Sequence, residues 1–181
     1  MSQLGTWLPN ALGFQFVWCA TVGGAARGLW WPGLLALAAF AGWQLRISRH
    51  RRADLQLMLV AAIGGFALDS LWVGLGWVQH RAALPWSPVA PVWIVALWIG
   101  FALTLNHSLA ALKPHRLLAI AFGALGGPLA YWIAAELWQA STIDGWIPYL
   151  ALALAWGVAT PLLLCLASRL TADPPSPTHA G

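Results

Sequence analysis

The chain has 181 residues, of which 60% are hydrophobic and only 8% carry a charge. A soluble domain carries about 25% charged residues, so this composition excludes an ordinary soluble protein. The net charge of +4 does not indicate nucleic-acid binding, because the basic residues lie between apolar stretches and form no groove-sized patch.

Six long apolar stretches fill the chain. A helix needs about 20 apolar residues to cross a ~30 Å hydrocarbon core, and it satisfies its own backbone hydrogen bonds. The sequence therefore predicts an all-α, polytopic transmembrane bundle of six helices. Residues 1–170 would form this single domain, and the polar, proline-rich residues 171–181 a disordered cytoplasmic tail. The stretches are Asn10–Arg27, Trp30–Gln44, Leu55–Val78, Pro91–Leu112, Leu117–Trp138 and Ile147–Ser168. Asn10, at the start of the first, is expected to cap its helix.

The basic residues are divided unequally between the two sides of this predicted bundle. Seven of the nine Lys and Arg residues fall on one side, and only Arg27 and Arg81 fall on the other. Basic residues prefer cytoplasmic loops, so we expect both termini in the cytoplasm. The seven are Arg46, Arg49, Arg51, Arg52, Lys113, Arg116 and Arg169.

The chain is rich in tryptophan, with 14 residues, and many lie near the predicted outer helix ends. An interfacial aromatic belt is the simpler interpretation. The alternative is an aromatic-lined mouth for an apolar or flat ligand, which the deeper Trp72, Trp98 and Trp132 favour. The residues near the outer ends are Trp30, Trp31, Trp77, Trp86, Trp93, Trp138 and Trp146.

Asp69 is the acidic residue predicted to lie deepest in the membrane, where an ionisable group is costly and therefore a candidate functional residue. At ~1.5 Å per residue, Asp69 and Tyr131 stand at the same height, ~21 Å from the cytoplasmic ends of their spans. Gly123 and Gly127 form a small-xxx-small motif that lets a neighbouring helix approach closely. We expect Asp69 to lie near Tyr131 and to be neutral or reached by water from the outer side. A purely structural clamp is the alternative.

A second polar layer is predicted nearer the cytoplasm, where Asn106, His107 and Ser108 interrupt the fourth stretch. In a helix, Thr104, His107 and Ser108 would share a face and Asn106 would point elsewhere. We expect that face to point into the bundle, because lipid cannot satisfy these groups, and Gln15 to lie within hydrogen-bonding range of the Asn106–Ser108 segment, directly or through water. The layer would serve headgroup recognition or acid–base chemistry, or it would only join helices.

The candidate site residues from both layers are Gln15, Asp69, Thr104, Asn106, His107, Ser108 and Tyr131. No motif of a known catalytic class occurs. The sequence predicts no metal site and no cofactor, and it leaves open whether the protein is an enzyme.

Four segments occur in an order and spacing that resemble a known family: Asn10–Trp18, Leu68–Trp72, Ala96–Leu109 and Gly126–Tyr131. Over most of its length the chain resembles a bacterial inner-membrane family known only as domain of unknown function 2878. The resemblance implies a multi-pass protein of the bacterial inner membrane and assigns no catalytic role. Members of the family are encoded near cyclopropane-fatty-acid synthases and other lipid-modifying enzymes. The resemblance therefore implies two kinds of partner: membrane lipid and other lipid-modifying membrane proteins.

Three functions follow as hypotheses. The first is membrane-lipid metabolism, in which the protein acts on or presents a fatty-acyl or isoprenoid substrate. The second is binding or transport of a small apolar ligand, with Asp69 as the coupling group. The third is a structural or accessory membrane subunit. The oligomeric state does not follow from the sequence.

Overall fold

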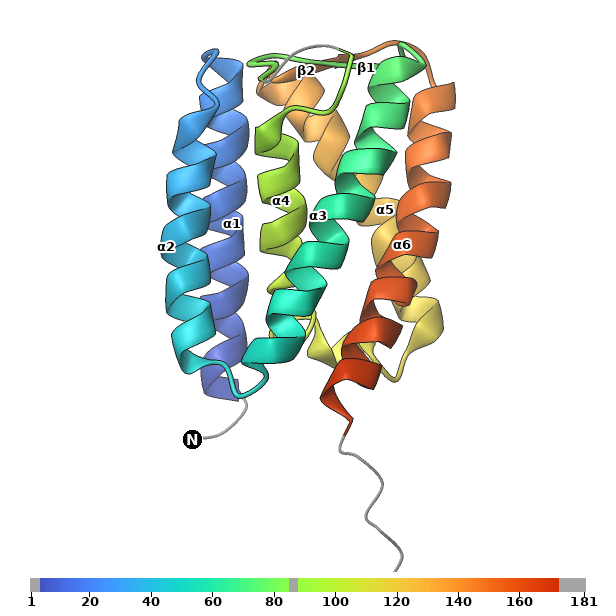
Figure 1. Ribbon diagram of the computed structural model, residues 1–181. Helices are drawn as coiled ribbons and strands as arrows, with labels where there is room; N and C mark the ends of the chain where they lie inside the picture. The colour runs from blue at the N-terminus through green and yellow to red at the C-terminus, as the bar shows by residue number, and fades with distance from the viewer. Residues whose placement is uncertain (1–3, 85–87, 173–181) are drawn as a thin grey trace, which may run out of the picture.

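The computed structural model describes residues 4–84 and 88–172, and the described part is 75% helical. Six helices form one bundle (Figure 1). Most of the predicted tail, and Trp86, lie outside the described residues. The helices are α1 (Leu4–Ala26), α2 (Trp31–Ile47), α3 (Arg51–Gly74), α4 (Val92–Ala102), α5 (Arg116–Trp132) and α6 (Ile147–Thr171).

Three helices are long and apolar enough to cross a membrane: α3, α6, and α5 continued by the π-helix η2 (Ile133–Leu137). Large apolar side chains cover the outside of the bundle, including Leu35, Ile63, Leu125 and Leu154. An apolar surface of this extent is unfavourable in water, which agrees with a bundle that lies in lipid.

The helices α4 and α6 organise the bundle. The short α4 packs against α1, α2 and α3, while α6 packs against α3 and α5. The start of α1, the end of α6 and the turns after α2 and α4 all lie at one end (Figure 1). We call this the basic end, because it carries Arg46, Arg49, Arg51, Arg52, Lys113, Arg116 and Arg169.

A two-stranded antiparallel sheet covers the opposite end, which we call the sheet end. The strands are β1 (Val78–His80) and β2 (Ser141–Ile143), and His80 lies opposite Ser141 in the register. The prediction of an all-α fold is wrong in this detail. Strands of three residues show no alternation that can be read from the sequence, and these two are far apart along the chain.

The fourth predicted span is also wrong in its length, because α4 ends at Ala102. Residues 103–109 form turns, and a 3-10 helix, η1 (Ala110–Leu112), follows. The hydroxyl of Thr104 donates to the carbonyl oxygen of Phe101 at 2.6 Å. Side-chain bonds of this kind compete with helical hydrogen bonds, and several polar residues follow in the same segment.

The close approach of α5 and α6 confirms the small-xxx-small prediction. A Cβ atom at Gly123 would lie 2.1 Å from the carbonyl oxygen of Trp156, and one at Gly127 would lie 2.3 Å from the Trp156 ring. No side chain fits at either position. The two glycines therefore allow Trp156 to pack flat against α5.

Candidate functional site

Asp69 is fully buried in α3, where its carboxyl group is held by two donors. The indole Nε1 of Trp98 donates to Asp69 Oδ2 at 2.7 Å, and the Tyr131 hydroxyl donates to Oδ1. The predicted contact between Asp69 and Tyr131 is thus confirmed. Within the described residues no basic side chain forms an ion pair with Asp69. The group links α3, α4 and α5 in the half of the bundle nearer the sheet end.

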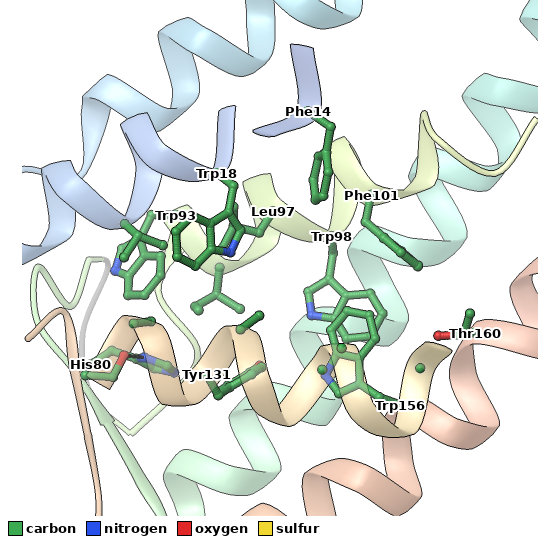
Figure 2. Close-up of a pocket in the computed structure, with 18 of the residues that line it drawn as sticks. Phe14, Trp18, His80, Trp93, Leu97, Trp98, Phe101, Tyr131, Trp156 and Thr160 are labelled. Carbon is green, nitrogen blue, oxygen red and sulfur yellow. Dashed lines mark hydrogen bonds between the residues drawn. The ribbon is translucent and has the colours of Figure 1, made fainter. Parts of the chain in front are cut away.

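An apolar cavity of about 160 Å³ lies beside this group, and both Trp98 and Tyr131 line it. Side chains from α1 and α5 face each other across it (Figure 2). Eight of the lining residues are Phe, Trp or Tyr: Phe14, Trp18, Trp93, Trp98, Phe101, Phe122, Tyr131 and Trp156. The rings of Trp98 and Trp156 are stacked, with centroids 4.3 Å apart. These packed rings give the cavity a rigid wall.

The cavity reaches the outer surface of the bundle. Phe122 of α5 lines the cavity, yet 45% of its surface is exposed. The helices α1 and α5 do not pack closely against each other, although both contribute to the wall. A ligand would therefore reach the cavity sideways, between these two helices.

The sequence predicts an aromatic-lined ligand site as one alternative, but only one of the three deeper tryptophans that favour it lines the cavity. Trp98 lines the cavity, whereas Trp72 stacks on Trp77 elsewhere and Trp132 is exposed. Trp18 and Trp156 were missed. The sequence does contain a signal for Trp18, because it follows Phe14 by four residues and the two side chains therefore share a face of α1.

His80 and Ser141, from the two strands, line the cavity at the sheet end. His80 Nδ1 lies 2.8 Å from Ser141 Oγ. The His80 ring also meets the Trp93 ring edge-on, with centroids 5.1 Å apart. Burial lowers the pKa of His80 to about 3, so the imidazole is neutral near pH 7. No sequence pattern indicated this residue, because its position depends on the pairing of two distant strands.

A separate polar cluster surrounds Asp54 at the basic end. Asp54 is fully buried in the first turn of α3, where the helix dipole favours a negative charge. Its Oδ1 accepts from Asn106 Nδ2 at 2.8 Å, and its Oδ2 lies 3.0 Å from His107 Nε2. Ser48 also donates to Oδ2. We call Ser48, Asp54, Asn106 and His107 the Asp54 cluster.

The Asp54 cluster corrects the predicted arrangement of the lower polar layer. Asn106 and His107 were expected on different faces of a helix, yet they bind the same carboxylate because this segment is not helical. Lys113 Nζ donates to Asn106 Oδ1 at 2.7 Å. Burial lowers the pKa of Lys113, and attraction to Asp54 opposes that shift. Since both carboxylate oxygens are occupied, the geometry fits a structural link between helices.

Asn10, rather than Gln15, joins α1 to this layer. Asn10 is fully buried inside α1 and is not an N-cap, while Gln15 is exposed and makes no hydrogen bond to the described residues. The amide nitrogen of Asn10 donates to Gln44 Oε1 at 2.9 Å, and its oxygen accepts from the Ser108 hydroxyl at 2.6 Å. The N-cap prediction for Asn10 is wrong, because α1 begins at Leu4, and the structure shows no direct hydrogen bond between Gln15 and the Asn106–Ser108 segment.

Thr104 belongs to neither group, since its hydroxyl is bonded to its own backbone segment. None of the Asp54 cluster residues lines the apolar cavity. In the part of the chain that the structure describes, no three His, Cys, Asp or Glu side chains are grouped to hold a metal ion. The structure thus contains an apolar cavity with a polar edge and, apart from it, a hydrogen-bonded cluster at the basic end.

A family described as "Protein of unknown function (DUF2878)" matches residues 7–162. No curated protein and no solved structure matches the chain.

Proposed function

We propose a function from the geometry itself, since the chain belongs to the DUF2878 family and the description of that family states no activity. The protein binds the hydrocarbon part of a membrane lipid in its aromatic-lined cavity and acts in fatty-acyl or isoprenoid lipid metabolism. The observation that carries this proposal is an apolar cavity, open at the side, in a bundle of membrane-length helices.

The size and lining of the cavity favour hydrocarbon. A dry, apolar cavity of about 150 Å³ in another protein binds benzene, so a cavity of this size accepts a ring or a short hydrocarbon segment. The rest of a longer chain would extend past Phe122 into the bilayer. The position of family members near cyclopropane-fatty-acid synthases supports a role in lipid metabolism.

Binding or transport of a small apolar molecule is a second candidate. It is favoured by Asp69, whose carboxyl group lies behind the cavity wall and is bonded to Tyr131 and Trp98. Protonation changes at Asp69 would then be transmitted to the cavity through these two side chains. Unchanged lipids together with altered uptake of an apolar compound in a deletion strain would distinguish this candidate from the first.

Filling the cavity tests the proposal. A Cβ atom at Gly126 meets no atom within 4 Å and lies at the cavity wall, so phenylalanine fits there and occupies the space. We expect deletion of the gene to change the acyl or isoprenoid lipid profile, and Gly126→Phe to fail to restore it.

The matched control is Gly64→Phe, because Gly64 is exposed on α3 and a Cβ there also meets no atom within 4 Å. It should restore the profile fully at equal protein abundance. Lipid mass spectrometry and an immunoblot are the measurements. A lipid profile unaffected by deletion, or full restoration by Gly126→Phe, would refute lipid metabolism through this cavity.

The proposal includes six membrane crossings, the fourth made by α4 together with the turns and η1 that follow it, with both termini on the cytoplasmic side of a bacterial inner membrane. The concentration of seven of the nine basic residues at the basic end supports that orientation. A C-terminal alkaline phosphatase fusion should be inactive and a C-terminal fluorescent-protein fusion bright. An active phosphatase at the C-terminus would reverse the assigned orientation.

A further inference from the structure

The cavity is apolar but carries buried polar atoms that lack partners. His80 Nε2, Trp156 Nε1 and Thr160 Oγ1 are all buried and form no hydrogen bond with the residues that the structure describes. All three side chains line the cavity. An unpaired polar atom in an apolar environment is unfavourable, and in a native protein it calls for an explanation. A ligand with a polar group provides one.

The polar atoms stand at different depths. Figure 2 shows His80 at one end of the cavity side chains and Thr160 at the other. His80 belongs to the sheet end, at the limit of the helices, whereas Thr160 lies about 20 Å into α6 at ~1.5 Å per residue. A lipid in a bilayer is oriented in the same way, because its polar group lies at the membrane surface and its hydrocarbon lies in the interior. The sheet end is therefore the place for the polar group of a ligand.

His80 is better suited than Thr160 to bind that group. A threonine hydroxyl in a helix can rotate toward a carbonyl group of the preceding turn, so it has an internal alternative. The His80 ring has none, because Nδ1 is engaged by Ser141 and Trp93 meets the ring edge-on. Among the described residues at this end of the cavity, Nε2 is therefore a buried hydrogen-bonding atom without a partner.

The charge of the surroundings limits the ligand. No Asp, Glu, Lys or Arg is among the described residues that line the cavity. Its burial lowers the pKa of His80 to about 3, so the imidazole is uncharged at neutral pH. An anionic headgroup would enter without a counter-charge, which is unfavourable in an apolar cavity.

We propose that the cavity binds an amphiphile with a single neutral polar group, such as a hydroxyl, aldehyde or ester, which forms a hydrogen bond with His80 Nε2 while the hydrocarbon runs along α5 toward Thr160. This inference rests on the proposed function and adds the chemical class of the ligand. It excludes a phosphate headgroup inside the cavity.

The test compares three probes on the purified protein in maltoside micelles: bromoundecanol, bromoundecane and bromoundecyl phosphate. Bromine quenches tryptophan fluorescence on contact, and the described part of the cavity wall contains four tryptophans, Trp18, Trp93, Trp98 and Trp156. Because exposed tryptophans such as Trp132 are quenched from the micelle as well, binding in the cavity is measured as the quenching that is lost in Gly126→Phe, whose side chain fills the cavity. We expect the alcohol to bind about tenfold more tightly than the alkane, the effect of one buried hydrogen bond. The phosphate should bind no better than the alkane.

His80→Phe should abolish the preference for the alcohol and retain binding of the alkane. The control is His115→Phe, since His115 is exposed at the basic end and should leave the preference intact. His80→Gln keeps a hydrogen-bonding group and should restore part of the preference, which separates recognition from a packing defect.

The outcomes distinguish the two proposals. If neither the alcohol nor the alkane quenches the wild type more than Gly126→Phe, both the proposed function and this inference are overturned. Equal binding of alcohol and alkane to the wild type overturns the inference alone and needs no variant. Preference for the phosphate, or a preference for the alcohol that persists in His80→Phe, also overturns it.

Discussion

Replacement of Asp54 by alanine should lower the free energy of unfolding by about 3 kcal/mol, from three hydrogen-bond partners at roughly 1 kcal/mol each. Asp54 is fully buried, and Ser48, Asn106 and His107 all hydrogen-bond to its carboxylate. Alanine would leave these groups without a partner in a place that water reaches poorly. Because the cluster joins the α2–α3 turn to the segment after α4, its loss should loosen the whole basic end.

The measurement is the midpoint of unfolding by SDS in detergent, followed by tryptophan fluorescence. Asp144→Ala is the matched control, since Asp144 is exposed at the sheet end and its replacement should leave the midpoint unchanged. Asp54→Asn should fall between the two, because an amide oxygen still accepts from Asn106. Equal midpoints for Asp54→Ala and Asp144→Ala would show that the cluster contributes nothing to stability.

The Asp54 cluster also shows which features the sequence does not predict. Apolar length alone located the six helices, although it overestimated the fourth, because α4 ends at Ala102. Asp54 was overlooked since it follows Arg51 and Arg52 and therefore reads as part of a charged loop. Only the fold reveals that α3 has already begun at Arg51, so that the aspartate faces inward.

The directions of the side chains around α1 explain why Asn10, and not Gln15, bonds to the polar layer at the basic end. Successive residues in a helix are separated by about 100°, so two residues five positions apart differ by about 140° around the axis. Once Asn10 points into the bundle, Gln15 must point largely away from it. Its height is also different, because Asn10 already stands at the level of Ser108 and Gln15 lies about 7.5 Å further along α1, at ~1.5 Å per residue.

Height alone was sufficient for Asp69 and Tyr131, because both lie deep in long, regular helices and a buried carboxyl group requires a donor. The cavity next to them was beyond prediction. It depends on the side-by-side placement of α1 and α5, and on strands β1 and β2, whose pairing brings His80 to Ser141. Contacts between distant segments of this kind leave no local pattern in one sequence.

Two adjacent glycines in α3 should respond in opposite directions to the same substitution. A Cβ atom at Gly65 would lie 2.1 Å from the Trp98 ring, whereas one at Gly64 would meet no atom within 4 Å. Two contacts hold Trp98 in place, since it stacks on Trp156 and donates to Asp69 at 2.7 Å. Gly65→Ala must therefore displace α3 from α4 or break that hydrogen bond.

We expect Gly65→Ala to lower the free energy of unfolding by about 3 kcal/mol, the upper range for overpacking a close-packed interior. Gly64→Ala should raise it by about 0.5 kcal/mol, because alanine is the better helix former at an exposed position. The two variants differ by one residue in position and by nothing in chemistry, so SDS unfolding midpoints compare the packing directly. A Gly65→Ala midpoint at or above that of the wild type would mean that Trp98 is not held against α3. It would also remove the physical basis for a rigid aromatic wall beside Asp69.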